Sequence, residues 1–146
     1  MTKPAKVFVA CAASDKAWAK ALEKSLARAG FAVASDRSAA KPGEAFARAI
    51  RNDLTQSDAF IFVVPALEGE GAGALMELGA AHMMDKPILG LVPERARFVN
   101  SDLISKISDG QMLDGSGLSA KEISQRVAPF VLAAASRRKT AKGAAA

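Results

Sequence analysis

The chain has 146 residues, half of them apolar, and this length and composition predict one globular domain with a single core. Its formal net charge of +5 would favour anionic partners, yet four of its 20 basic residues lie in the last eleven positions, which hold no acid. The remaining 16 basic and 15 acidic residues nearly balance, so a nucleic-acid partner is not expected.

These last positions suggest a division of the chain. We expect a folded domain over 1–135 and a basic flexible tail over 136–146. No apolar run approaches the roughly 20 residues that span a bilayer, and no signal peptide is visible, so we expect a cytoplasmic protein without a membrane partner. Cys11 is the single cysteine, which excludes an internal disulfide.

Two apolar runs open the chain, and neither alternates with polar residues as a half-exposed strand does. Such runs are typical of strands that are buried on both faces, as in parallel sheets. Ser14 is a favourable N-cap for a helix between them, with Asp15 suited to its first turn and Gly30 to its end. The two strands are predicted at 7–11 and 31–34.

A polar loop at 35–43 follows, and beyond it Phe46, Ile50 and Leu54 recur every four residues. This spacing gives a helix one apolar face and predicts a second helix. Another unbroken apolar run at 59–64 predicts a third buried strand.

A glycine-rich loop then leads to a predicted helix at 74–84 whose first half is apolar apart from Glu77. An acid among leucine, methionine and alanine is costly unless it has a role, and ligands of open α/β sheets bind beyond the carboxyl ends of the strands. Glu77 is therefore the leading candidate for a functional residue. The alternative is that it only stabilises the start of its helix through the helix dipole. His82 lies about 140° from Glu77 around the helix, so the two are poorly placed to act together.

The remaining elements complete an alternating pattern of strands and helices. Ser119 and Glu122 form a capping box, which predicts the start of the last helix. The whole pattern predicts an α/β fold: a flavodoxin-like three-layer sandwich with a five-stranded parallel sheet and helices on both faces. The elements between are a strand at 88–92, a short helix at 102–107 and an edge strand at 112–113.

In their order and spacing, these pieces resemble a bacterial TIR (Toll/interleukin-1 receptor homology) domain over residues 5–132. No single piece is specific, and the resemblance rests on the set. The matching stretches are Ser14–Trp18, Ala29–Val33 with Asp36, Pro42–Phe46, Ile50–Val64 with Gln56–Asp58 before the strand, Glu77–Ala81 and Lys86–Leu89.

The TIR resemblance implies one of two functions. Enzymatic members cleave the nicotinamide–ribose bond of NAD, by hydrolysis or cyclisation, with a glutamate at the position of Glu77, commonly in bacterial defence or virulence. Other members are non-catalytic assembly modules that associate through the loop corresponding to 35–43. In the enzymatic case NAD is the substrate, so neither a cofactor nor a metal is expected. The substrate-binding residues that the resemblance implies are Cys11, Ala12, Asp36, Gly43, Phe46 and Gly73.

The chain also departs from the usual enzymatic pattern, which leaves the assembly module open. Gly73 stands where those enzymes place an aromatic residue, and Ala10–Cys11 replaces their Ser-Tyr or Ser-His. In addition, Gly73–Ala81 followed by Lys86–Pro87 resembles nucleoside 2-deoxyribosyltransferases, in which a glutamate attacks the anomeric carbon. Both enzyme families break an N-glycosidic bond through an oxocarbenium-like state, which a carboxylate stabilises or attacks.

Overall fold

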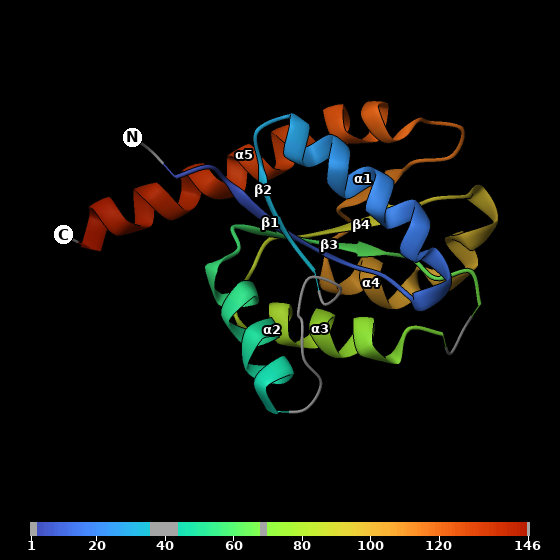
Figure 1. Ribbon diagram of the computed structural model, residues 1–146, viewed down its shortest axis with the longest axis horizontal. Helices are drawn as coiled ribbons and strands as arrows, with labels where there is room; N and C mark the ends of the chain where they lie inside the picture. Colours follow the sequence, from blue (N-terminus) through green and yellow to red (C-terminus); the bar gives the residue numbers. More distant parts are fainter. Residues whose placement is uncertain (1–2, 36–43, 68–69, 146) are drawn as a thin grey trace.

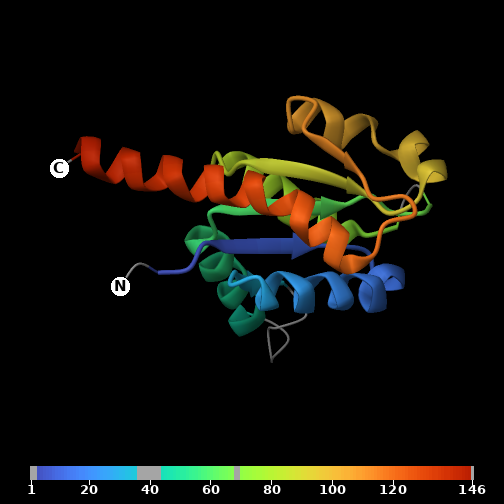
Figure 2. The same ribbon diagram turned by 90° about the horizontal axis from the view of Figure 1, so that it is seen from above.

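The described part of the chain forms a five-stranded parallel sheet between two layers of helices (Figures 1 and 2). The structure is a computed structural model that describes residues 3–35, 44–67 and 70–145, with side chains except at 44–46 and 139–145. The strand order β2-β1-β3-β4-β5, with every neighbouring pair parallel, confirms the predicted flavodoxin-like fold. The strands are β1 (Lys6–Ala10), β2 (Ala32–Ala34), β3 (Ala59–Val63), β4 (Ile88–Val92) and β5 (Met112–Asp114).

Helices cover both faces of this sheet, and each face has its own apolar cluster. Successive side chains of a strand point to opposite faces, so β1 supplies Val7 and Val9 to one cluster and Phe8 to the other. Phe8 stacks on Phe60 of β3, with 5.6 Å between the ring centroids. One face carries α1 (Lys16–Arg28) and α5 (Ala120–Ala145); the other carries α2 (Glu44–Gln56), α3 (Ala72–Met83) and α4 (Asp102–Ile107).

The predicted N-cap of the first helix is wrong. A short 3-10 helix, η1 (Ala13–Asp15), precedes α1, and no side chain caps either start. The hydroxyl of Ser14 instead donates to Oε2 of Glu70, at 3.1 Å. The local sequence favours an N-cap, but the hydroxyl of Ser14 forms its hydrogen bond with the loop before α3.

The last helix crosses the predicted boundary at residue 135 and continues to Ala145. Alanine, arginine and lysine favour helix, and no glycine or proline interrupts the chain from 130 to 142. Nη1 of Arg138 lies 2.9 Å from Oδ1 of Asp58, whose side chain is fully buried where β3 begins. Arg138, which was assigned to the tail, is therefore ionically paired with the residue just before β3. The capping box at the other end of α5 is confirmed, because Ser119 and Glu122 exchange hydrogen bonds.

Candidate functional site

Glu77 lies in the second turn of α3 and is only 8% exposed. Ala74, Leu78 and Ala81 of the same helix pack against the sheet, at the spacing of one helical face. Glu77 precedes Leu78 by one position, or about 100° around the helix. Its side chain therefore leaves α3 beside the sheet-facing stripe, which accounts for the low exposure of an acid outside the core.

A cleft of about 480 Å³ lies between α2 and α3, and Glu77 forms part of its wall. Most lining residues are apolar, and among those described only Glu77 and Arg51 carry charge. An apolar surround lowers the local dielectric and strengthens the attraction between a carboxylate and a positive group. The lining residues are Ala47, Ile50, Arg51, Leu54, Gly73, Met76, Glu77, Ala80 and Met84.

Three of the residues predicted to bind substrate have described positions and side chains. Gly73 lies one turn before Glu77 and lines the same cleft. Cys11 and Ala12 are buried just beyond the end of β1, and neither is among the lining residues of that cleft. Cys11 packs in the cluster beneath α1 and α5, on the other face of the sheet. The structure thus brings Gly73 and Glu77 together.

The other predicted substrate residues cannot be placed in the same way. Asp36 and Gly43 lie outside the described residues, as does the proposed assembly loop at 35–43 apart from Ser35. Phe46 belongs to the first turn of α2, and its side chain is outside the described part of the chain.

Comparison with known families identifies the chain. The TIR domain profile matches residues 7–127, which is most of the chain and includes all but the first residue of β1, Glu77 and the start of α5. The chain belongs to the TIR domain family. No protein with a curated function is similar enough in sequence to be matched.

Solved structures share the fold of this TIR domain at low sequence identity. The CMP N-glycosidase BcmB from Clostridium botulinum is 21% identical with a TM-score of 0.60, over 86% of this chain and 98% of that chain. The flavodiiron core of Flv1 from Synechocystis sp. is 16% identical with a TM-score of 0.59, over 92% of this chain and 37% of that one. At such identities the likeness shows the fold alone.

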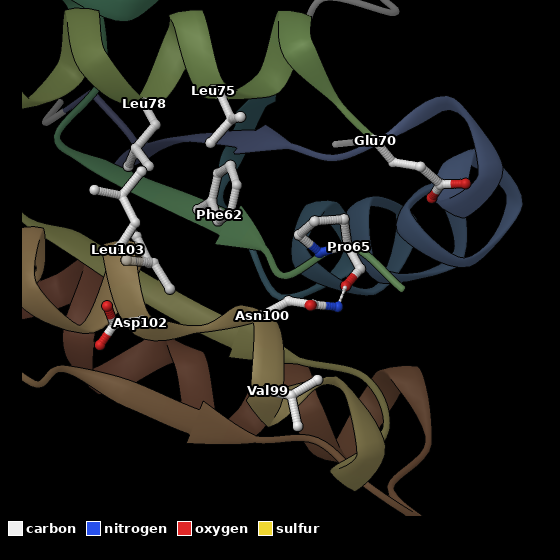
Figure 3. A pocket seen from close by; sticks show the side chains of 10 residues that line it. Phe62, Pro65, Glu70, Leu75, Leu78, Val99, Asn100, Asp102 and Leu103 are labelled. Carbon is white, nitrogen blue, oxygen red and sulfur yellow. Dashed lines mark hydrogen bonds between the residues drawn. The ribbon is translucent and has the colours of Figure 1, made fainter. Parts of the chain in front are cut away.

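A second pocket of the TIR domain, about 290 Å³ in volume, lies on the other side of α3, between α3 and α4 (Figure 3). Leu75 and Leu78 form its α3 wall, whereas Met76 and Glu77 line the larger cleft. Opposite sides of the same turn of α3 therefore line two different cavities. The remaining lining residues are Phe62, Pro65, Glu70, Val99, Asn100, Asp102, Leu103 and Ile104.

A buried ion pair that the sequence did not predict lies at the edge where the strands end, here called the carboxyl edge. Nη1 of Arg97 lies 2.7 Å from Oδ2 of Asp15, and their side chains are 11% and 5% exposed. Arg97 belongs to a 3-10 helix, η3 (Arg95–Asn100), in a stretch for which no helix or strand was predicted. The hydrogen bond to Asp15 raises the pKa of Arg97 above its ordinary value, against the opposing effect of burial. No local pattern could reveal the pair, because 82 positions separate its members.

Other features of the chain do not join the Glu77 cleft. His82 is exposed on α3 and lines a separate pocket with Lys86 and Arg137, near the edge where the strands begin. Among the residues that the structure describes, no three His, Cys, Asp or Glu side chains gather where they could hold a metal ion. Within the same ranges, no helix combines the length and apolar content needed to cross a membrane.

Proposed function

We propose that this TIR domain cleaves the bond between nicotinamide and ribose in NAD, with Glu77 as the catalytic carboxylate. The observation that carries this proposal is the setting of Glu77: a nearly buried acid on the wall of a largely apolar cleft. Family membership supports it, because enzymatic TIR domains use a glutamate at the matching position. The cleft volume of about 480 Å³ is within the range of small-molecule sites.

The chemistry requires one well-placed carboxylate. As the C1′–N bond breaks, its electron pair leaves with nicotinamide, whose ring nitrogen loses its positive charge, so no acid is needed to protonate the leaving group. Positive charge develops on the ribose, and the Glu77 carboxylate stabilises it from the apolar wall. Water then adds to C1′ and releases a proton to solvent; attack by an atom of the adenine ring would give the cyclic product instead.

Arg51 has a complementary role in this proposal. It is the cationic residue of the cleft among those described, and it lies on α2, across the cleft from α3. NAD carries a pyrophosphate, which a guanidinium binds through charge-assisted hydrogen bonds. Arg51 would hold the pyrophosphate while the ribose lies against Glu77.

The test is to incubate the purified protein with NAD and resolve the products by chromatography. Wild type should release nicotinamide with ADP-ribose or a cyclic isomer, and Glu77→Gln should not, with a thermal midpoint close to that of wild type. The control is Asp85→Asn, an exposed acid just after α3 with a φ of 56°, a conformation that asparagine also adopts. Equal turnover by Glu77→Gln would rule out the catalytic assignment.

A second substrate belongs in the same assay. BcmB, which shares the fold, is named as a CMP N-glycosidase, and the chemistry at the anomeric carbon is of the same class. Release of cytosine from CMP, lost in Glu77→Gln, with NAD left intact would move the assignment to a nucleotide N-glycosidase. A deoxyribosyltransferase would instead transfer the sugar to an added base.

The non-catalytic alternative rests on the outer surface of α3. Met76 and Met83 are 77% and 81% exposed, and Val99 and Leu103, which line the pocket between α3 and α4, are 84% and 52% exposed. Exposed apolar patches of this kind mark interaction sites. An assembly module would self-associate in sedimentation experiments and leave both NAD and CMP unchanged.

A further inference from the structure

The chain that leaves β3 is held by side chains of η3. Nη1 of Arg97 donates to the carbonyl oxygen of Val64 at 3.1 Å. Nδ2 of Asn100 donates to the carbonyl oxygens of Pro65 and Ala66, each at 3.0 Å, and Figure 3 shows the bond to Pro65. Three successive carbonyl groups at the carboxyl edge thus accept hydrogen bonds from two residues of one short helix.

Of these two η3 residues, Arg97 is also bound by the segment after β1. Arg97 is paired with Asp15 of η1, so a single guanidinium joins η1, the end of β3 and η3. Both side chains of this pair are nearly buried, and a guanidinium is charged at any physiological pH.

Further along, the connection to α3 rests on the same segment. Glu70 accepts the hydroxyl hydrogen of Ser14, and Gly71 lies so close to Ala12 that a Cβ on Gly71 would be 3.3 Å from the Cβ of Ala12. Gly71 has a φ of 75°, which an L side chain rarely adopts, and the next residue begins α3. Residues 64–66 are thus held by η3, and Glu70 and Gly71, immediately before the helix that carries Glu77, contact the segment after β1.

We propose that Arg97 and Asn100 are positioning residues for the Glu77 cleft. They fix where the chain leaves β3, and this in turn fixes where α3 begins and how its first two turns face α2. The proposal rests on the proposed function, because the group that they position is the Glu77 carboxylate. Neither residue lines the cleft, so each acts through the loop and not by touching substrate.

Two substitutions test the proposal, and two others control for loss of stability. Asn100→Asp keeps the size of the side chain but removes both N–H donors, and Arg97→Gln removes the ion pair with Asp15. Arg95→Gln is the first control. Arg95 lies on the same η3, but its side chain is 84% exposed and its ion pair with Asp114 is long, with 3.9 Å between Nε of Arg95 and Oδ2 of Asp114. Arg138→Gln is the second control, because it breaks an arginine–aspartate pair with a fully buried carboxylate at the opposite edge of the sheet.

The first measurement is hydrogen exchange and needs no activity. The amide of Leu75 donates to the carbonyl of Gly71 and forms the first turn of α3. Exchange at this amide should accelerate in Asn100→Asp and Arg97→Gln and stay unchanged in both controls. Unchanged exchange in the two test variants would overturn the proposal, whether or not the protein cleaves NAD.

The second measurement is kcat and KM for NAD, well below the thermal midpoint of every variant. A carboxylate displaced by a fraction of an ångström to 1 Å should lower kcat by about ten- to a hundredfold in the test variants. An equal loss in Arg138→Gln would show that only stability was affected and would overturn the positioning role. If wild type cleaves no NAD, the proposed function fails and the exchange measurement alone decides the inference.

Discussion

Arg51 is the residue whose role the proposed substrate defines most sharply. It faces the cleft from α2, and no described acid other than Glu77 lines that space. We expect Arg51→Gln to raise KM for NAD by about tenfold, since a hydrogen bond to a charged group contributes about 1.5–3 kcal/mol and this one is partly solvated. The value of kcat should change little, and Arg51→Lys should recover part of the loss. Steady-state kinetics of the three proteins measure both constants.

A result in which Arg51→Gln lowers kcat and leaves KM unchanged would contradict this role. It would place Arg51 next to the reacting atoms instead of the pyrophosphate.

Gly73 is the second residue at which the cleft can be altered directly. A Cβ built on Gly73 meets no atom within 4 Å, and the residue lies one turn before Glu77. We expect Gly73→Trp to fold normally and to lower KM for NAD, because an aromatic ring can stack on a flat heterocycle at the open side of the cleft. Gly73→Ala is the matched control for changed helix propensity. The prediction fails if the two variants have the same KM.

At the scale of single elements, α5 begins with a pair of reciprocal hydrogen bonds. The backbone N–H of Glu122 donates to Oγ of Ser119 at 3.1 Å, and the N–H of Ser119 donates to Oε1 of Glu122 at 3.2 Å. The bond from the Ser119 backbone is the main reason why the pKa of Glu122 lies below its ordinary value. A carboxyl group with a lowered pKa stabilises the folded state above its unfolded pKa, and this contribution is lost as pH falls through the folded value.

We therefore expect the stability of α5 to depend on pH through Glu122. Ser119→Ala should lower the free energy of unfolding at pH 7 by about 1 kcal/mol, through loss of the N-cap. The difference in stability between wild type and Glu122→Gln should be largest near neutral pH and shrink when the solution is acidified below about pH 4. Urea unfolding of the three proteins at several pH values provides the measurement. A difference that is constant with pH would contradict the assignment.

Elements with a local signal were predicted well from the sequence. The β4 strand and the α4 helix have the predicted bounds, because an apolar run and a helical spacing each depend on neighbouring residues. The 3-10 helices η1 and η3 were not predicted. Their geometry depends on Asp15, Arg97 and Asn100, whose partners are 33 to 82 positions away.

The candidate site was predicted in part for the same reason. The apolar context of Glu77 is visible in the sequence, and so is its place beyond the end of β3. The opposite wall of the cleft, including Arg51 and Ile50, arises only when α2 packs beside α3. The face of the sheet toward which Cys11 points depends on the pleat at the end of β1. Cys11 points toward α1 and α5, away from the cleft.

For the molecule as a whole, Arg138 joins the C-terminal half of α5 to Asp58, just before β3. Besides Arg138, the buried carboxylate accepts the backbone N–H of Lys6 at 2.9 Å. Nearby, Lys86 donates to the carbonyls of Thr55 and Ser57, and burial lowers the pKa of Lys86 from its ordinary value. Removing Arg138 would leave Asp58 buried without its closest described cation.

Truncation should reveal this dependence. A chain ending at 135 should be less stable than one ending at 138 by about 1–3 kcal/mol, less than for a fully buried pair because Arg138 is 33% exposed. The chain ending at 138 should unfold like the full-length protein. Chemical denaturation of the three lengths measures the difference. Equal stability of the two truncated chains would mean that the ion pair contributes nothing.

The separation of the apolar core into two clusters has a consequence for spectroscopy. Trp18 is the only tryptophan, the chain has no tyrosine, and Trp18 packs against the cluster beneath α1 and α5. The Glu77 cleft lies beyond the other face of the sheet, next to the cluster that contains Phe60 and Leu78. Intrinsic fluorescence therefore reports on one side of the sheet. We expect its emission maximum to shift red on unfolding but to stay unchanged when a non-hydrolysable NAD analogue fills the cleft, so binding must be followed by calorimetry or by a label on α2.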